Sequence, residues 1–255
     1  MPNFAANLTM LFQELPELDR FDAASAAGFG AVEMLFPYDI PAPQIQSALL
    51  RNALSLELIN CPPPNYTGGP RGFAAVPECQ DRFRHDFKRA LRYAETLGAR
   101  LLHIMAGPAS GPDARRTFVE NLLWASDIAQ KQKLTIEPIN DIDMPGYFLN
   151  DFDLAAEILD EVAAPNLALQ FDTYHAHKIH GDVAACWAKH GHRVGHIQIG
   201  GIPDRHEPAG GPFDFPAFFK MLDATGYDGA VSAEYVPSGR TTESGLGWLK
   251  LRPVT

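Results

Sequence analysis

The stretch Leu167-Ala168-Leu169-Gln170-Phe171-Asp172 is short, rich in apolar residues and closed by a carboxylate. A strand of a parallel sheet has this character, because other elements cover both of its faces. The stretch therefore predicts a buried strand over Leu167–Phe171, with Asp172 at the point where the strand meets its loop. The same design recurs on both sides of it.

Strand-like and helix-like segments alternate from one end of the chain to the other. The expected strands are Phe4–Leu8, Ala31–Leu35, Leu54–Ile59, Leu101–Met105, Leu134–Ile139, Leu167–Phe171, Val194–Ile199 and Gly229–Tyr235. The expected helices are Leu18–Ala27, Pro43–Asn52, Asp81–Leu97, Asp113–Lys133, Asp151–Val162, Asp182–Lys189 and Phe215–Ala224. Eight such units in 255 residues, with no linker, predict an α/β fold: one (β/α)8 TIM-barrel domain over 1–255. A doubly wound nucleotide-binding sheet is disfavoured, because no GxGxxG turn follows the first strand.

Composition and charge narrow the classes of partner. The chain has 46% hydrophobic and 20% charged residues, as ordinary globular proteins do, and a formal net charge of −10. That charge predicts neither a nucleic acid nor a membrane partner, since both are anionic. The cysteines, Cys61, Cys79 and Cys186, form no CxxC pair, which favours a reducing compartment. With no secretory signal or apolar span visible, a cytoplasmic protein is expected, and a homo-oligomer is compatible with the sequence.

Four late strands carry an oxygen-bearing side chain at their carboxyl ends. These residues are Glu137, Asp172, Gln198 and Glu234. In a TIM barrel such ends converge on the mouth where the chemistry takes place. Three carboxylates gathered there repel one another unless a cation neutralises them, and an oxygen-only set suits a hard or borderline ion. The sequence thus predicts one divalent cation, Mg²⁺ or Mn²⁺; the alternative for any single residue is a salt-bridged strand rim.

Several segments carry a family likeness: Ile136-Glu137-Pro138-Ile139-Asn140, Met144-Pro145-Gly146-Tyr147, Phe171-Asp172-Thr173-Tyr174-His175, Gly195-His196-Ile197-Gln198-Ile199, Glu234-Tyr235, the tail Glu243–Trp248, and the N-terminal segments Ala6–Phe12 and Val32–Tyr38. Together they resemble the hydroxypyruvate isomerase family of the xylose-isomerase-like barrel superfamily. The likeness covers nearly the whole chain. It departs from the family at Ile59-Asn60, where relatives carry His-Asn, and in the loop 140–143.

The resemblance implies that Glu137, Asp172, Gln198 and Glu234 bind the metal and that Glu137 and Glu234 are the catalytic acid–base pair. It also implies a small hydroxy-keto acid substrate, with hydroxypyruvate converted to tartronate semialdehyde (2-hydroxy-3-oxopropanoate) through an enediolate. Isomerases of four-carbon 2-oxo acids (2-oxo-tetronate) and sugar 3-epimerases share these features and stay open as alternatives.

Three further residues are predicted to bind the substrate. Arg71 and Arg205 lie in loops over the expected mouth, where an Arg fork matches a carboxylate. The resemblance gives His175 a hydrogen bond to a substrate oxygen. The ordinary alternatives are solvated or salt-bridged arginines and a packed histidine. For Glu33 a strand-end salt bridge is favoured over a role in support of the site, and His196 is expected to be a core histidine.

Two zinc-based interpretations are disfavoured. The pair His175-Ala176-His177 has the HxH spacing of zinc hydrolases, but those barrels carry it on the first strand. Endonucleases of the same superfamily need a zinc cluster with further histidines and a basic face. This chain has no such histidines at the ends of its second and third strands. A barrel that only binds sugar acids would leave the two glutamates without a role.

Overall fold

Short parallel strands form one curled sheet in the computed structural model, which describes residues 2–61 and 69–250 except the side chain of Lys250. Every neighbouring pair in the sheet runs parallel. The strands of the described residues are β1 (Asn3–Asn7), β2 (Ala31–Glu33), β3 (Ser55–Leu56), β4 (Leu58–Asn60), β5 (Leu101–His103), β6 (Lys133–Ile136), β7 (Leu167–Asp172), β8 (Val194–Ile199) and β9 (Ala230–Ala233).

The sheet closes into a barrel through the segment that holds β3 and β4. Its order is β3-β2-β1-β9-β8-β7-β6-β5-β4, so the two ends of the sheet belong to neighbouring residues of the chain. Between them, the N–H of Glu57 donates to the carbonyl of Val32 (2.8 Å), and the carbonyl of Glu57 accepts from the N–H of Leu101 (2.8 Å). The third expected strand therefore contacts β2 on one side and β5 on the other. The predicted TIM barrel is confirmed.

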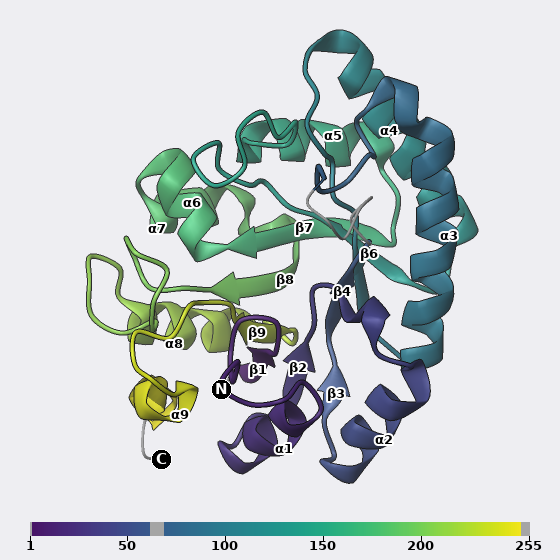
Figure 1. Ribbon diagram of the computed structural model, residues 1–255. Helices are drawn as coiled ribbons and strands as arrows, with labels where there is room; N and C mark the ends of the chain where they lie inside the picture. The colour runs from purple at the N-terminus through teal and green to yellow at the C-terminus, as the bar shows by residue number, and fades with distance from the viewer. Residues whose placement is uncertain (1, 62–68, 251–255) are drawn as a thin grey trace.

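Helices surround the strands in chain order (Figure 1). The α-helices of the described residues are α1 (Asp19–Ala26), α2 (Ala42–Arg51), α3 (Gln80–Leu97), α4 (Gly111–Ile128), α5 (Phe152–Val162), α6 (Thr173–His180), α7 (Val183–His190), α8 (Phe215–Thr225) and α9 (Thr242–Gly245). The 3-10 turns are η1 (Pro37–Asp39), η2 (Pro77–Cys79), η3 (Gly191–Arg193) and η4 (Leu246–Lys250). In α3, Phe83, Phe87 and Leu91 form the buried stripe. In the described part of the chain, no helix combines the length and apolar character of a membrane span.

Helix α6 was not among the expected helices. It begins directly after β7, and Asp172 is its N-cap: the carboxylate accepts from the backbone N–H groups of Tyr174 (2.7 Å) and His175 (3.4 Å). An Asp at this position satisfies N–H groups that have no partner within the helix. Because no turn residues separate strand from helix, the sequence pattern carried no boundary signal there.

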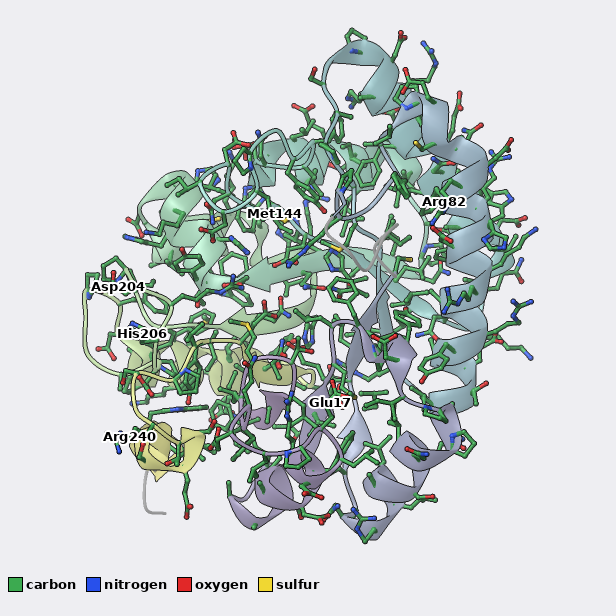
Figure 2. The ribbon with its side chains drawn as sticks, in the orientation of Figure 1. Glu17, Arg82, Met144, Asp204, His206 and Arg240 are labelled. Atoms are coloured by element: carbon green, nitrogen blue, oxygen red, sulfur yellow. The ribbon has the colours of Figure 1, made fainter. Side chains whose placement is uncertain are left out.

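The carboxyl ends of the late strands lie at the same level of the barrel. Asp172 pairs in register with Gln198, and Gln198 with Ser232, two residues before Glu234. The loops that follow these strands also gather at this edge. In Figure 2, Met144 marks the loop after β6, and Asp204 and His206 mark the loop after β8.

Candidate active site

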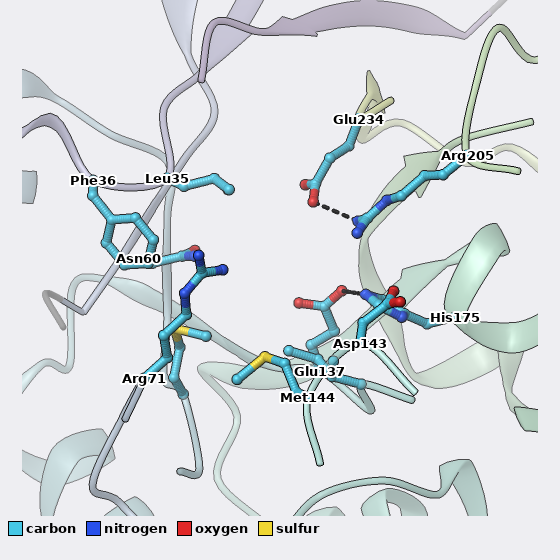
Figure 3. A pocket seen from close by; sticks show the side chains of 12 residues that line it. Leu35, Phe36, Asn60, Arg71, Glu137, Asp143, Met144, His175, Arg205 and Glu234 are labelled. Atoms are coloured by element: carbon cyan, nitrogen blue, oxygen red, sulfur yellow. Dashed lines mark hydrogen bonds and ion pairs between the residues drawn. The ribbon is translucent and has the colours of Figure 1, made fainter. Parts of the chain in front are cut away.

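A cavity of about 110 Å³ opens at the carboxyl edge of the barrel. Its lining residues are Leu35, Phe36, Asn60, Arg71, Met105, Glu137, Ile139, Asp143, Met144, His175, Arg205 and Glu234 (Figure 3). Pockets for drug-sized ligands measure roughly 300–1,000 Å³, so this cavity suits a ligand of few heavy atoms. Arg71, Asp143 and Met144 also line a wider hollow of about 380 Å³ beside it.

Three buried carboxyl groups lie at this end of the barrel, and two of them, Glu137 and Glu234, line the cavity. Glu137 follows β6, Asp172 ends β7 and Glu234 follows β9. Burial, together with the negative charges of the neighbouring carboxylates, raises the pKa of Glu137 and of Glu234 well above the ordinary value. Burial also raises the pKa of Asp172, against the opposing charge of Arg205. The cluster therefore has more negative charge than the protein compensates.

This donor set fits a divalent metal ion. Glu137, Asp172 and His175 each offer a ligand atom, and these atoms lie within 4.8 Å of one another. Carboxylate oxygens are suitable ligands for Mg²⁺ or Mn²⁺. A divalent charge at this point would remove the repulsion that raises the pKa of the glutamates. Of the predicted ligands, Glu137 and Asp172 belong to this group, and Glu234 lies on the other side of Arg205.

Arg205 supplies a positive charge among the carboxylates. Its Nη2 donates to Oδ2 of Asp172 (2.9 Å) and to Oε1 of Glu234 (2.7 Å). Its Cζ lies 4.9 Å from the centroid of the Tyr174 ring. The loop that carries it is tightly turned, with the N–H of Arg205 bound to the carbonyl of Gly201 (2.8 Å). Arg205 is thus an internal counter-ion of the site as well as a lining residue of the cavity.

Gln198 lies in a chain of buried amides. Its Nε2 donates to Oε1 of Glu33 (2.9 Å) and to Oε2 of Glu234, and its Oε1 accepts from Nε2 of Gln170 (2.7 Å). Gln170 also donates to Oε2 of Glu137 (3.0 Å). To bind a metal as predicted, Gln198 would have to use Oε1, the atom that already accepts the hydrogen bond from Gln170.

The imidazole of His175 faces the carboxylates through Nε2. That atom lies 3.9 Å from Oε1 of Glu137 and 3.8 Å from Oδ2 of Asp172. The other ring nitrogen, Nδ1, lies 2.7 Å from the amide nitrogen of Asn140, which can only donate, so Nδ1 accepts. Burial, and then the charge of Arg205, hold the pKa of His175 well below the ordinary value. A neutral ring with its proton on Nε2 therefore faces the cavity.

Arg71 approaches the cavity from the wall opposite the carboxylates (Figure 3). Its loop is held against the end of β5: the N–H of Ala75 donates to the carbonyl of Ala106 (2.8 Å). Gly72 has φ +87°, and a Cβ on it would lie 2.4 Å from the carbonyl oxygen of Met105. Only glycine permits this close approach, which brings Arg71 over the mouth.

Glu33 ends β2 and pairs with His196, as the strand-end salt bridge favoured by the sequence would, and two amides bind the same carboxylate. It is fully buried, and its Oε2 lies 2.8 Å from Nε2 of His196. Its Oε1 accepts from the amides of Asn7 (2.8 Å) and Gln198. His196 is buried as expected. Burial alone would raise the pKa of Glu33, but the hydrogen bond and charge of His196 outweigh it and lower the pKa.

The early strands also end in polar side chains, of which the sequence interpretation considered Glu33 and Asn60 but not Asn7 or His103. Asn7 ends β1, Glu33 ends β2, Asn60 ends β4 and His103 ends β5. Nδ1 of His103 lies 3.1 Å from Oδ1 of Asn60 and 3.7 Å from Oε2 of Glu137. The criterion that identified the late strand ends would have identified these residues too.

Comparisons with known proteins identify the family of this barrel. A family described as xylose isomerase-like TIM barrel matches residues 21–252. The chain belongs to this family. The 2-oxo-tetronate isomerase of Cupriavidus necator is 47% identical to this xylose isomerase-like barrel, and the hydroxypyruvate isomerase of Escherichia coli is 37% identical; each match covers 98% of both chains. A crystal structure described as AP endonuclease, family 2, from Brucella melitensis superposes with a TM-score of 0.94 at 41% identity over 98% of both chains.

These full-length relatives bear out two expectations. The family resemblance noted on the strand-end motifs is confirmed, and this xylose isomerase-like barrel is an enzyme of the isomerase class. The two acids in the names of the relatives are stated for those proteins alone.

Proposed function

We propose that this barrel is a metal-dependent isomerase of a small hydroxy-keto acid, with hydroxypyruvate and 2-hydroxy-3-oxopropanoate as the first pair to test. Isomerisation of a four-carbon 2-oxo-tetronate and 3-epimerisation of a sugar are the alternatives. One observation carries the proposal: the buried carboxyls of Glu137 and Glu234 line one small cavity from two sides (Figure 3).

Substrate binding is assigned to the wall of the cavity that faces the carboxylates. Arg71 can hold the carboxylate of an acid in two parallel hydrogen bonds. The negative charge of that acid is repelled by Glu137, Asp172 and Glu234, which orients its reacting carbons toward them and its carboxylate away. His175, neutral and protonated on Nε2, is placed to donate to a substrate oxygen.

A single divalent ion, Mg²⁺ or Mn²⁺, is assigned to Glu137, Asp172 and Glu234, with Gln198 to complete the set. Bound there, it would supply Lewis-acid stabilisation of the negative charge that develops on the substrate oxygens. Arg205, which contacts two of the three carboxylates, holds them in place from the side.

The two glutamates are assigned the proton transfers. In hydroxypyruvate, one glutamate removes a proton from C3, which carries the primary hydroxyl, and a proton returns to C2, the ketone carbon. The hydroxyl proton passes from the oxygen on C3 to the oxygen on C2, so atoms and charge balance. Both carboxyls are buried and line the cavity, and a carboxyl in this position can both accept and donate a proton. Acid–base help of this kind contributes about 10²–10⁴-fold to the rate.

A substrate panel tests the proposal. Metal-stripped protein is reloaded with Mg²⁺ or Mn²⁺ and offered hydroxypyruvate, 2-oxo-tetronate, ketohexoses and DNA that contains an abasic site. Metal-dependent conversion of an acid supports the isomerase. Conversion of ketohexoses alone would favour the epimerase alternative, and cleavage of the DNA would favour an endonuclease. Tight binding of the acids without turnover would leave only a binding protein.

A further inference from the structure

Glu33 lies close to Glu234 inside the barrel, where Asn7 bridges the two carboxylates, and belongs to none of the groups assigned to the reaction so far. It is fully buried at the end of β2, where an ionised carboxyl is costly unless donors surround it. Its donors come from strands on both sides of the barrel: Asn7 on β1, and His196 and Gln198 on β8. A group so well supplied with donors defines the direction in which each of them points.

Two of these donors are amide nitrogens that Glu33 shares with Glu234. Nδ2 of Asn7 donates to Oε1 of Glu33 (2.8 Å) and to Oε2 of Glu234 (3.0 Å). Nε2 of Gln198 likewise donates to both carboxylates. Each amide nitrogen carries two hydrogens in one plane, so the carboxylate that takes one hydrogen determines where the other points.

The oxygens of the same amides are also bound, which prevents the amides from turning over. Oδ1 of Asn7 accepts from the backbone N–H of Thr9 (2.9 Å), and Oε1 of Gln198 accepts from Gln170 (2.7 Å). Oε2 of Glu234 is thereby held toward the interior, and its Oε1 faces Arg205. The arrangement leaves Glu234 one orientation relative to the cavity.

We propose that Glu33 is a positioning residue of this isomerase, which fixes the carboxylate of Glu234 through the amides of Asn7 and Gln198. The inference rests on the proposed function, in which Glu234 transfers a proton. If Glu33 only joined β1, β2 and β8, its loss would lower stability without a specific effect on turnover. A positioning role acts on kcat, because a displacement of about 1 Å at a reacting group costs about 10²-fold.

Two substitutions distinguish the effect of the length of the Glu33 side chain from the effect of its charge. Glu33→Asp keeps the charge but shortens the side chain by one methylene, so it cannot hold both amides. Glu33→Gln keeps the length, and its oxygen can still accept from Asn7 and Gln198 while its amide faces His196. We expect Glu33→Asp to lower kcat by about 10²-fold with KM changed less than about threefold, and Glu33→Gln to restore kcat to within about tenfold of the wild type. The plateau of the pH–rate profile should fall in Glu33→Asp without a shift along the pH axis.

Wild-type kcat in a folded Glu33→Asp variant would overturn the inference. A larger loss in Glu33→Gln than in Glu33→Asp would do the same, because it would assign the effect to the charge of Glu33 and not to its length. If Glu33→Asp fails to fold, Asn7→Ala removes one of the two bridges with Glu33 in place; we expect a loss of about tenfold in kcat, and no loss would contradict the proposal. Gln132→Ala is the matched control, since this buried amide donates to the carbonyls of Ala99 (3.1 Å) and Arg100 (2.9 Å) outside the cavity. It should lower the melting temperature and leave kcat unchanged.

The two proposals can fail separately. Inactivity of the wild type on every acid of the panel would overturn the proposed function. The positioning role of Glu33 would then be tested by a structural readout. That readout is the crystallographic position of the Glu234 carboxylate in Glu33→Asp: a displaced carboxylate supports the positioning role, and an unmoved one overturns it.

Discussion

Buried carboxyls occur at two levels of this barrel. At one level an arginine balances the carboxyl, and at the other the carboxyls outnumber the arginine. Toward the amino edge, Glu57 has one arginine to itself: Nε of Arg100 donates to it at 2.7 Å, and the hydroxyl of Ser55 donates at 2.9 Å. At the carboxyl edge, Glu137, Asp172 and Glu234 face one another with Arg205 among them. A balanced pair joins elements, whereas an excess of like charge needs a further cation. The difference indicates which edge holds the chemistry.

The largest effect is expected where the unbalanced charges are removed. Glu137→Gln or Glu234→Gln should lower kcat by about 10²–10⁴-fold, because the proton acceptor is lost while the shape is kept. The melting temperature should not fall, since one of the mutually repelling carboxylates is gone. Steady-state kinetics and thermal unfolding check both statements, and near-normal turnover in either variant would refute the assignment of that glutamate.

The next effect concerns metal removal and its dependence on pH. Chelation should abolish turnover, and Mn²⁺ at about 100 times its Kd should stabilise the protein by about 2.7 kcal/mol. The folded-state pKa of Glu137 and of Glu234 is raised above 4.5, so their contribution to stability is full below 4.5 and is lost as pH rises through the raised values. Metal binding displaces these protons and becomes tighter with rising pH.

Thermal unfolding with and without Mn²⁺ measures this dependence. The increase in melting temperature caused by Mn²⁺ should grow between about pH 5 and about pH 8. An increase that is constant over this range would show that the glutamates are not the groups that release protons. In the control variant Arg100→Gln, whose barrel mouth is intact, the Mn²⁺-induced increase in melting temperature should grow with pH as it does in the wild type.

A smaller effect is expected at the wall that faces the carboxylates. Arg71→Ala should raise KM for the acid by about 10–10²-fold with little change in kcat, because a charge-assisted pair contributes about 1.5–3 kcal/mol. Arg71→Lys should recover part of this loss, since lysine keeps the charge without the fork. An unchanged KM in Arg71→Ala would remove Arg71 from the substrate site. Arg82, which belongs to α3, offers a control substitution away from the cavity.

The smallest effect is expected at the balanced pair. Arg100→Gln should lower the free energy of unfolding by about 1.5 kcal/mol, because Glu57 loses a charged donor in a setting that solvent partly reaches. Turnover should be unchanged. A loss of kcat in Arg100→Gln would break the contrast between the two edges of the barrel.

Several features of the site could be predicted from the sequence because they depend on local periodicity. Alternating strand and helix patterns identified the barrel, and a polar residue at a strand end belongs at the mouth of any such barrel. Glu137, Asp172 and Glu234 were found on that basis. The strand ends Asn7 and Glu33 carry the same signal, although their role in support of the site depends on partners more than a hundred residues away.

The sequence by itself determined the alternation of strands and helices, the family and the edge at which the polar side chains collect, because each follows from short segments and their spacing. Only the tertiary structure decided the partners of those side chains: Arg205 between two carboxylates, Gln198 turned toward Gln170, and Glu33 joined to Glu234 through shared amides. Closing the sheet brings β1, β2 and β8 around one core, and hydrogen-bond geometry across that core cannot be read along a single strand.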